Sequence, residues 1–318
     1  MRGEHRSPTF AALSWLLFLS LLASVLACRS PGPSSAHTAE LRASDPRVPI
    51  EFFKERFVFC RGLVNGHEVD MLLDSGAGVT VLSRSLADRL QLEGESDRRI
   101  QGSGGRQSVL WAEDVRIDVG PLTLRGLRTA VLDVGALEEE LGRELPVILG
   151  REVFASCVVE LDPARRTLAL LDPASFEYAG GGTTLPFVPV NGGWITAARV
   201  NGLSLSLDVD TGSGANLILF PEFARRAGLL SEPAPEPTRY LLGVGGRTPI
   251  HDIVVDSFEL GDREFTGLPA QIHAGDTGAL STSAAEGNLG AGVLYRFRTT
   301  FDAKARQLHL EGTRPPSD

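Results

Sequence analysis

The sequence predicts a mainly β protein built from two similar lobes in a single chain, with a few short helices. Three observations lead to this prediction: blocks of sequence recur in the same order in both halves, short apolar segments alternate with Gly- and Asp-rich breaks, and helix signals are sparse. A chain of 318 residues is long enough for two domains that each bury a core.

The repeat is clearest around two aspartates. Residues 64–78 read VNGHEVDMLLDSGAG, residues 200–214 read VNGLSLSLDVDTGSG, and the two align without a gap. This alignment sets Asp74 opposite Asp210, at an offset of 136. Residues 149–170 match residues 289–310 at an offset of 140. We therefore expect a first lobe over residues 48–172, a linker over 173–182 and a second lobe over 183–313.

The first lobe contains several segments with the composition of strands. They are rich in β-branched and apolar residues, and Gly- or Asp-rich breaks separate them. These segments span residues 57–59, 68–73, 108–117, 122–132 and 157–161.

Helix signals follow each aspartate loop. Ser83 can cap a short helix that turns Leu86 and Leu90 inward, and Pro221 can open a helix over residues 222–228. A third short helix is expected over residues 136–141, where the acidic run 138–140 indicates a solvated face.

The N-terminus has the pattern of an export signal. Arg2 and Arg6 precede the apolar stretch 11–27, and Cys28 follows Ala27 as in a bacterial lipoprotein signal. This pattern predicts a signal segment over residues 1–28, lipidation of Cys28 and a flexible tether over residues 29–47. An ordinary secretory signal and an uncleaved anchor are the alternatives. All three place the globular part outside the cytoplasm, in the periplasm or outer cell envelope.

Composition excludes several classes of function. A net charge of −9 with no long basic run argues against nucleic acid as a partner. The histidines lack metal-ligand spacing, and the Gly-rich segments lack the Lys-Ser/Thr of a phosphate loop. We expect neither a metal nor a cofactor. Cys60 and Cys157 form a disulfide or remain as two buried thiols; the sequence leaves both open.

The paired aspartates indicate acid–base chemistry. Two carboxylates a few ångström apart share one proton, so one can act as a base while the other acts as an acid. Gly76 and Gly212 let the two loops approach, and Ser75 and Thr211 supply hydroxyls that can bond across the interface. A further triplet at residues 276–278 follows no apolar strand, and we interpret it as a turn.

The chain resembles the retropepsin-like aspartic proteases, in their bacterial single-chain tandem form, over nearly all of residues 48–313. The resemblance implies two acid-protease β-barrel lobes and a catalytic dyad of Asp74 and Asp210. It also implies that residues 147–150 and 289–290 support the aspartate loops, and that the Gly-rich segments 100–109 and 241–250 form flaps over the cleft. The glycines of these flaps are Gly102, Gly104, Gly105, Gly243, Gly245 and Gly246.

Three features of the second lobe depart from the family pattern. Asp208 lies two residues before Asp210 on the same strand face, Asn288 precedes Leu289 where an apolar residue is usual, and neither flap contains a tyrosine. Ser213 follows the second triplet, where the first lobe has Ala77. Its hydroxyl predicts that Asp210 is the ionised member of the dyad and that Ser213→Ala shifts the acid limb of the rate profile upward.

The resulting hypothesis is an exported, lipid-anchored aspartic endopeptidase. It would act as a two-lobed monomer on a peptide or protein substrate bound in an extended conformation. Cleavage between bulky apolar residues is what the resemblance implies. The alternatives are a catalytically inactive binding or assembly module of the cell envelope, and lobes that pair with those of a second molecule.

Overall fold

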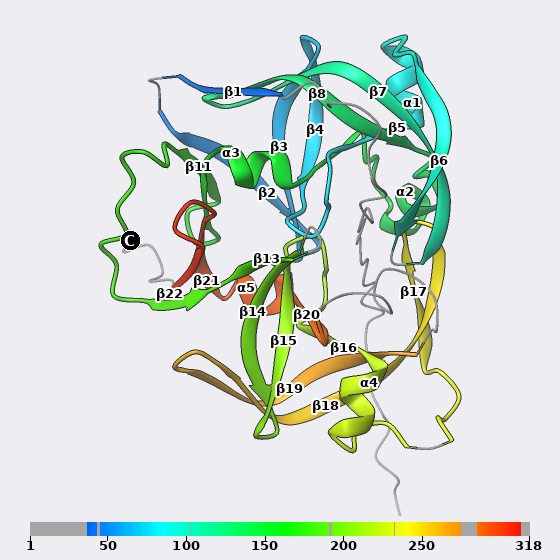
Figure 1. Ribbon diagram of the computed structural model, residues 1–318, viewed down its shortest axis with the longest axis vertical. Helices are drawn as coiled ribbons and strands as arrows, with labels where there is room; N and C mark the ends of the chain where they lie inside the picture. The colour runs from blue at the N-terminus through cyan, green and yellow to red at the C-terminus, as the bar shows by residue number, and fades with distance from the viewer. Residues whose placement is uncertain are drawn as a thin grey trace, which may run out of the picture.

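The computed structural model describes residues 37–42, 45–102, 104–190, 193–231, 233–274 and 285–312. It confirms a mainly β chain with two lobes and few helices (Figure 1). The predicted signal segment, Cys28 and the triplet at 276–278 lie outside the described residues. Within the described ranges, no helix is long and apolar enough to span a membrane.

In the first lobe the structure describes eleven strands and three helices, all of which end before residue 173. The strands are β1 (Thr38–Leu41), β2 (Arg47–Phe53), β3 (Phe57–Val64), β4 (His67–Leu73), β5 (Val81–Ser83), β6 (Gly94–Gly102), β7 (Gly105–Val119), β8 (Leu122–Leu132), β9 (Val147–Leu149), β10 (Val158–Asp162) and β11 (Thr167–Leu171). The helices are α1 (Arg84–Arg89), α2 (Gly135–Leu141) and α3 (Arg151–Ser156).

The second lobe repeats this order with eleven described strands and two described helices. The strands are β12 (Thr183–Pro186), β13 (Val188–Val190), β14 (Gly193–Val200), β15 (Leu203–Asp210), β16 (Leu217–Leu219), β17 (Arg239–Gly243), β18 (Gly246–Leu260), β19 (Arg263–His273), β20 (Gly287–Gly290), β21 (Phe297–Asp302) and β22 (Gln307–Gly312). The helices are α4 (Pro221–Arg226) and α5 (Ala291–Leu294).

The two lobes share one pairing scheme around the aspartate strands. In the first lobe, β4 runs parallel to β9, β9 antiparallel to β5, and β5 parallel to β8. In the second lobe, β15, β20, β16 and β19 pair in the same order and directions. The two aspartates therefore lie at the ends of equivalent strands, β4 and β15, in equivalent sheets.

Six neighbouring strands of one sheet join the two lobes. Their order is β12-β22-β21-β10-β11-β2, so three strands of the second lobe are followed by three of the first (Figure 1). The lobe boundary lies between β10 and β21, where Glu160 pairs with Thr300. Phe154 of α3 packs edge-on against Phe301 with ring centroids 5.0 Å apart. The main apolar core consequently runs through both lobes rather than stopping at their interface.

Helix α1 begins where the sequence predicted. The Ser83 hydroxyl accepts the Leu86 N–H at 3.1 Å, and Leu86 is buried. Helix α4 begins at Pro221 and buries Phe223 fully. Helix α2 has Gly142 in the left-handed region as its C-cap, which ends the helix after Leu141.

The tether prediction is wrong for part of its length. Residues Thr38–Leu41 form β1, which pairs antiparallel with the edge of β8. Arg42 extends this pairing, because its backbone N–H donates to the Pro121 carbonyl at 3.0 Å, and its guanidinium donates to the Gly120 carbonyl at 2.7 Å. Strand β8 would otherwise leave backbone N–H and C=O groups unpaired along this edge, so the chain upstream of the lobe is held in place there.

Cys60 and Cys157 are two free, buried thiols and do not form a disulfide. Burial raises the pKa of each to about 12. Both therefore act as small apolar core residues.

Candidate active site

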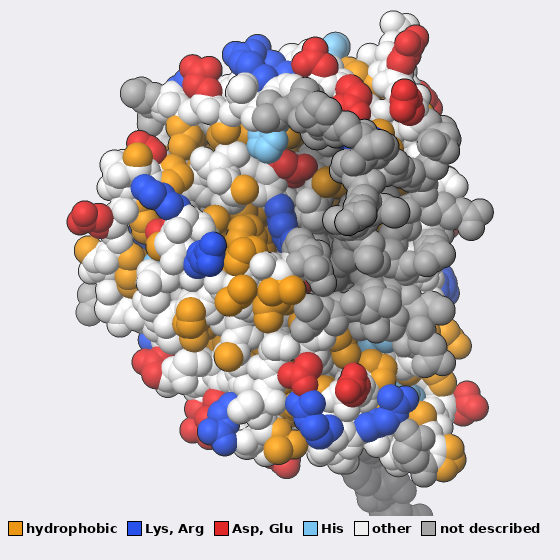
Figure 2. Space-filling view, in the orientation of Figure 1, with side chains coloured by type: hydrophobic (Ala, Val, Ile, Leu, Met, Phe, Trp, Pro, Cys, Tyr) orange, Lys and Arg blue, Asp and Glu red, His pale blue; other side chains and the backbone are white. Residues whose placement is uncertain are grey.

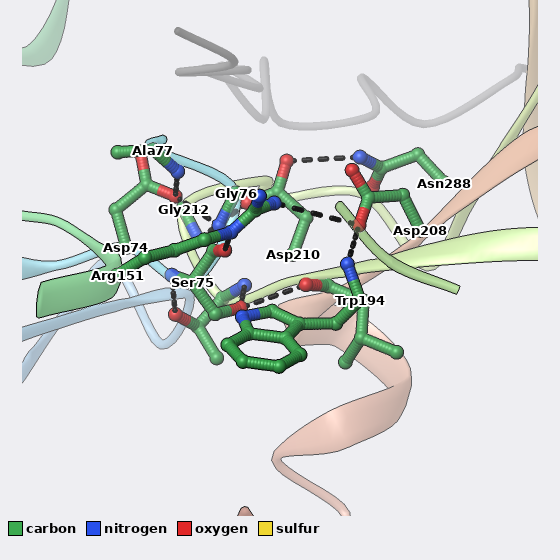
Figure 3. Close-up of polar contacts among 12 residues, drawn as sticks. Asp74, Ser75, Gly76, Ala77, Arg151, Trp194, Asp208, Asp210, Gly212 and Asn288 are labelled. Atoms are coloured by element: carbon green, nitrogen blue, oxygen red, sulfur yellow. Dashed lines mark hydrogen bonds and ion pairs between the residues drawn. The ribbon is translucent and has the colours of Figure 1, made fainter. Parts of the chain in front are cut away.

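The two aspartate loops meet at the interface between the lobes. Asp74 follows β4 and Asp210 ends β15, and both side chains are fully buried (Figure 3). The Asp74 N–H donates to the Leu149 carbonyl at 3.0 Å, which ties the loop to β9. In the second lobe, Asp210 pairs with Gly290 of β20. Both carboxylates of the pair therefore come from one chain.

Only glycine fits beside each carboxylate. A Cβ on Gly76 would lie 2.5 Å from Cγ of Asp210, and a Cβ on Gly212 would lie 2.3 Å from Cγ of Asp74. Real carbon atoms do not approach so closely. The glycines of the two triplets thus allow each carboxylate to lie against the opposite loop.

Ser75 and Thr211 bond reciprocally across the lobe interface. The Ser75 N–H donates to Oγ1 of Thr211 at 2.9 Å, and the Thr211 N–H donates to Oγ of Ser75 at 3.0 Å. Each hydroxyl then donates to the opposite strand, Ser75 to the Val209 carbonyl at 2.8 Å and Thr211 to the Leu73 carbonyl at 3.1 Å. These four buried bonds fix one aspartate loop relative to the other.

Backbone N–H groups hold each carboxylate in the same way. Oδ1 of Asp74 accepts from the N–H groups of Gly76 and Ala77 at 2.8 and 3.1 Å. Oδ1 of Asp210 accepts from those of Gly212 and Ser213 at the same distances. This correspondence follows from the repeat and makes the dyad nearly symmetric.

Asn288 breaks the symmetry of the dyad. Its Nδ2 donates to Oδ2 of Asp210 at 2.9 Å, whereas the equivalent residue of the first lobe is the apolar Ile148. Burial raises the pKa of both aspartates, and the charge of Asp210 raises that of Asp74 further. The Asn288 amide opposes this rise for Asp210 alone. Asp210 is therefore the better candidate for the ionised member.

The predicted role of the Ser213 hydroxyl is wrong. Oγ of Ser213 is buried and makes no hydrogen bond to any residue that the structure describes. Ser213 contributes only its backbone N–H, and Ala77 does the same for Asp74. The sequence placed a hydroxyl near Asp210 but could not show where it points. The group that favours the charged form is the amide of Asn288.

We expect Asn288→Leu to shift the acid limb of the rate profile upward. Loss of the amide N–H removes a hydrogen bond to the charged form of Asp210, so its pKa rises and ionisation requires a higher pH. Ser213→Ala is the matched control and should leave that limb in place. The apparent pKa belongs to the coupled pair, and it is read from the pH dependence of kcat/KM. Equal profiles for both variants would contradict this assignment.

A third acid lies beside the dyad. Asp208 is 3% exposed, and its Oδ1 accepts the Trp194 N–H at 2.8 Å. Arg151 reaches it from the first lobe, with Nη2 at 3.8 Å from Oδ1 of Asp208 (Figure 3). The Arg151 guanidinium also donates from Nε to the Ser75 carbonyl at 3.0 Å. Arg151 therefore links the first aspartate loop to the extra carboxylate of the second lobe.

Asp208 should make the stability of the protein depend on pH. Burial raises its pKa from 3.8 to about 6, with Arg151 acting in the opposite direction. The folded state then binds this proton more tightly than the unfolded state, so stability falls as pH rises from about 4 to about 6, by ~3 kcal/mol. Asp208→Asn should remove this part of the dependence. Urea unfolding of both proteins at pH 4, 5, 6 and 7 tests it, and a constant difference between them would contradict it.

The Gly-rich segments form two hairpins whose tips touch. Strands β6 and β7 turn at Gly102 and Gly105, and β17 and β18 turn at Gly243 and Gly246. The Gly104 N–H donates to the Val244 carbonyl at 2.9 Å. The sequence expected flaps at these positions, and the structure brings them together on one side of the interface (Figure 1). A cavity of about 260 Å³ lies between the second hairpin and α2.

Gly104→Ala should weaken closure of the two hairpins. A Cβ at this position would lie 1.9 Å from the Gly246 carbonyl oxygen, so the tips must separate and the bond to Val244 is lost. Loss of one such bond, about 1 kcal/mol, lowers kcat/KM by about fivefold or more if closure accompanies catalysis. Gly181→Ala is the control, because nothing lies within 4 Å of its Cβ position. Equal kcat/KM for the two variants would count against a role for tip contact.

Sequence reasoning missed three contacts of the site, made by the side chains of Arg151 and Tyr295 and by the backbone N–H of Trp194. The Tyr295 hydroxyl donates to the Thr211 carbonyl at 3.2 Å and so supports the second loop. Arg151 could have been suspected from its place directly after Leu149-Gly150, where the second lobe has Ala291. Trp194 contributes a backbone N–H, which no sequence pattern marks.

Among the described residues, no group of three or more His, Cys, Asp or Glu side chains could hold a metal ion. Two β lobes with equivalent pairing schemes, joined by reciprocal Asp-Ser-Gly and Asp-Thr-Gly loops, define the aspartic protease class.

The chain belongs to the aspartyl protease family. The family model matches it twice, over residues 60–153 and 196–293, once in each lobe. This confirms the resemblance seen in the sequence. Among solved structures, the chain is similar to a retropepsin-like aspartic protease from Rickettsia conorii, at 23% identity and a TM-score of 0.32, over 42% of this chain and 96% of that one. The comparison with curated proteins gave no match.

Proposed function

We propose that the protein is an aspartic endopeptidase that hydrolyses peptide bonds with a water activated between Asp74 and Asp210. One observation carries this proposal: each buried carboxylate is held by two backbone N–H groups and lies against the glycine of the opposite triplet. A rigid, desolvated pair of this kind can share one proton and place two oxygens around one water.

The asymmetry of the dyad supports different tasks for the two aspartates. Ionised Asp210 takes a proton from the water, whose oxygen attacks the scissile carbonyl carbon. Asp74, which burial and the charge of Asp210 keep protonated, donates to the carbonyl oxygen. The tetrahedral diol then collapses as the amide nitrogen is protonated and the C–N bond breaks. The products are a carboxyl and an amine, and the dyad regains its single shared proton.

The substrate would lie in an extended conformation between the dyad and the two hairpins. Among the described strands, β6 and β17 each end their sheet, so their outer edges offer backbone groups to which an added strand can pair. Figure 2 shows acidic and basic side chains interspersed along the upper and lower edges of one face, with apolar side chains between them. We further propose, from the N-terminal sequence, that this two-lobed monomer is exported and lipid-anchored at Cys28.

Peptide cleavage by the full chain tests the proposed function. A diverse peptide library is incubated at pH values from about 3 to 8, and the products are identified by mass spectrometry. Gel filtration of the active fraction reports whether a monomer is sufficient. A folded protein that cleaves nothing across this range would replace the peptidase with the binding or assembly module. Activity confined to a dimer would contradict a dyad formed within one chain.

A further inference from the structure

The two lobes differ in one row of side chains next to the dyad. Residues two apart on a strand point to the same face about 7 Å apart, so Leu72 and Asp208 lie on the same face as the aspartates that follow them. Cross-strand pairing extends this face across each sheet. The pairing scheme is the same in both lobes, so the two rows can be compared residue by residue.

In the first lobe the row is entirely apolar. Its members pair in register across β3, β4, β9, β5, β8 and β7. All of them are buried in one apolar cluster, which also includes Val244 of the second hairpin. In strand order they are Phe59, Leu72, Ile148, Val81, Ala130 and Trp111.

In the second lobe, polar residues replace most of the row. In strand order its members are Ile195, Asp208, Asn288, Ile218, Gln271 and Asp252. Three of the polar members are almost fully buried: Asp208 and Gln271 are 3% exposed and Asn288 is 0% exposed. Only Asp252 lies toward solvent, where Arg239 binds it with two bonds.

The buried part of this row offers hydrogen-bond acceptors that remain free. Oδ1 of Asn288 and Oε1 of Gln271 have no partner among the described residues. The Asn288 amide is oriented by its bond from Nδ2 to Asp210, so its oxygen can only accept. The contact of Asp208 with Arg151, at 3.8 Å, is too long for a hydrogen bond. Buried acceptors without partners are costly, and a bound N–H donor would satisfy them.

We propose that the second lobe provides a polar subsite next to the dyad, which binds a substrate side chain carrying N–H donors: Lys, Arg, Gln or Asn. The apolar row of the first lobe binds an apolar side chain on the other side of the scissile bond. The enzyme would then cleave between one apolar and one donor-bearing residue. This inference rests on the proposed peptidase function and corrects the expectation of two bulky apolar residues.

A series of matched peptides tests the polar subsite. The peptides carry an apolar residue on one side of the cleaved bond and Leu, Gln, Lys or Glu on the other, in both orders. In one order, kcat/KM for Gln or Lys should exceed that for Leu and Glu by about tenfold or more, as expected for a buried hydrogen bond. Equal or faster cleavage of the Leu peptides would overturn the inference. Preference for Glu would also overturn it, because Arg151 would then select the side chain.

Variants in which second-lobe residues of the row are replaced by their first-lobe equivalents provide the control. Gln271→Ala introduces the residue found at the equivalent position, Ala130, and should reduce the preference for Gln or Lys over Leu severalfold. Adding Asp208→Leu and Asn288→Ile should reverse it. An unchanged preference in Gln271→Ala and in a folded triple variant would refute the subsite.

Peptide binding to Asp74→Asn separates this inference from the proposed function. Fluorescence anisotropy of the labelled peptides needs no cleavage and should show the same order of affinity. Selective binding without cleavage by the wild type would leave the subsite in place and reject the peptidase. Cleavage with no selectivity would support the peptidase and reject the subsite.

Discussion

Replacement of Asp74 or Asp210 with Asn should lower kcat for peptide cleavage by about 10²- to 10⁴-fold, the range expected when a general acid or base is lost. Neither aspartate can substitute for the other, because one must hold a proton while the other accepts one. The double variant should be hardly slower than either single variant, since the two act as a unit. Initial rates on a cleaved peptide measure all three effects.

The same variants should remain folded. An Asn oxygen can still accept the N–H groups of Gly76 and Ala77, or those of Gly212 and Ser213. Replacing a buried carboxyl with a neutral amide also removes a desolvation cost. Asp88→Asn, an exposed position on α1, controls for unspecific effects. Full activity in either dyad variant would exclude the mechanism proposed above.

Thr211→Val should destabilise the protein by about 2–6 kcal/mol. Valine keeps the shape of threonine but lacks Oγ1, which accepts the Ser75 N–H and donates to the Leu73 carbonyl. Both groups would remain buried without a partner, and each such group costs about 1–3 kcal/mol. Thr211→Ser, which keeps the hydroxyl, is the matched control. Urea unfolding gives the difference.

The Thr211→Val substitution should impair catalysis as well as stability. The four hydrogen bonds that Ser75 and Thr211 make across the interface hold the two aspartate loops in register. A displacement of ~1 Å between reacting groups can cost ~10²-fold in rate. Thr211→Val should therefore also lower kcat, while Thr211→Ser retains most of it. If Thr211→Val proves as stable and as active as Thr211→Ser, the reciprocal bonds do not join the lobes.

Local sequence patterns predicted the repeat, the mainly β fold and the helices that follow each aspartate loop. They succeeded because the signals involved act over a few residues. These signals are the composition of a strand, the helix cap at Ser83, and the proline at a first helical position, Pro221. The tether prediction failed over Thr38–Leu41 because composition cannot show a free strand edge elsewhere in the chain. The Ser213 prediction failed because proximity in sequence does not give the direction of a hydroxyl.

The sequence by itself determined that this chain carries two equivalent aspartate loops, since duplication is a property of residue order. Only the tertiary structure decided what surrounds them. Arg151 reaches Asp208 across the lobe interface, and Asn288 reaches Asp210 from a neighbouring parallel strand. Gln271 joins the same face only through the register of β16 with β19. These contacts depend on strand register and lobe docking, which are set by packing between residues far apart in the chain.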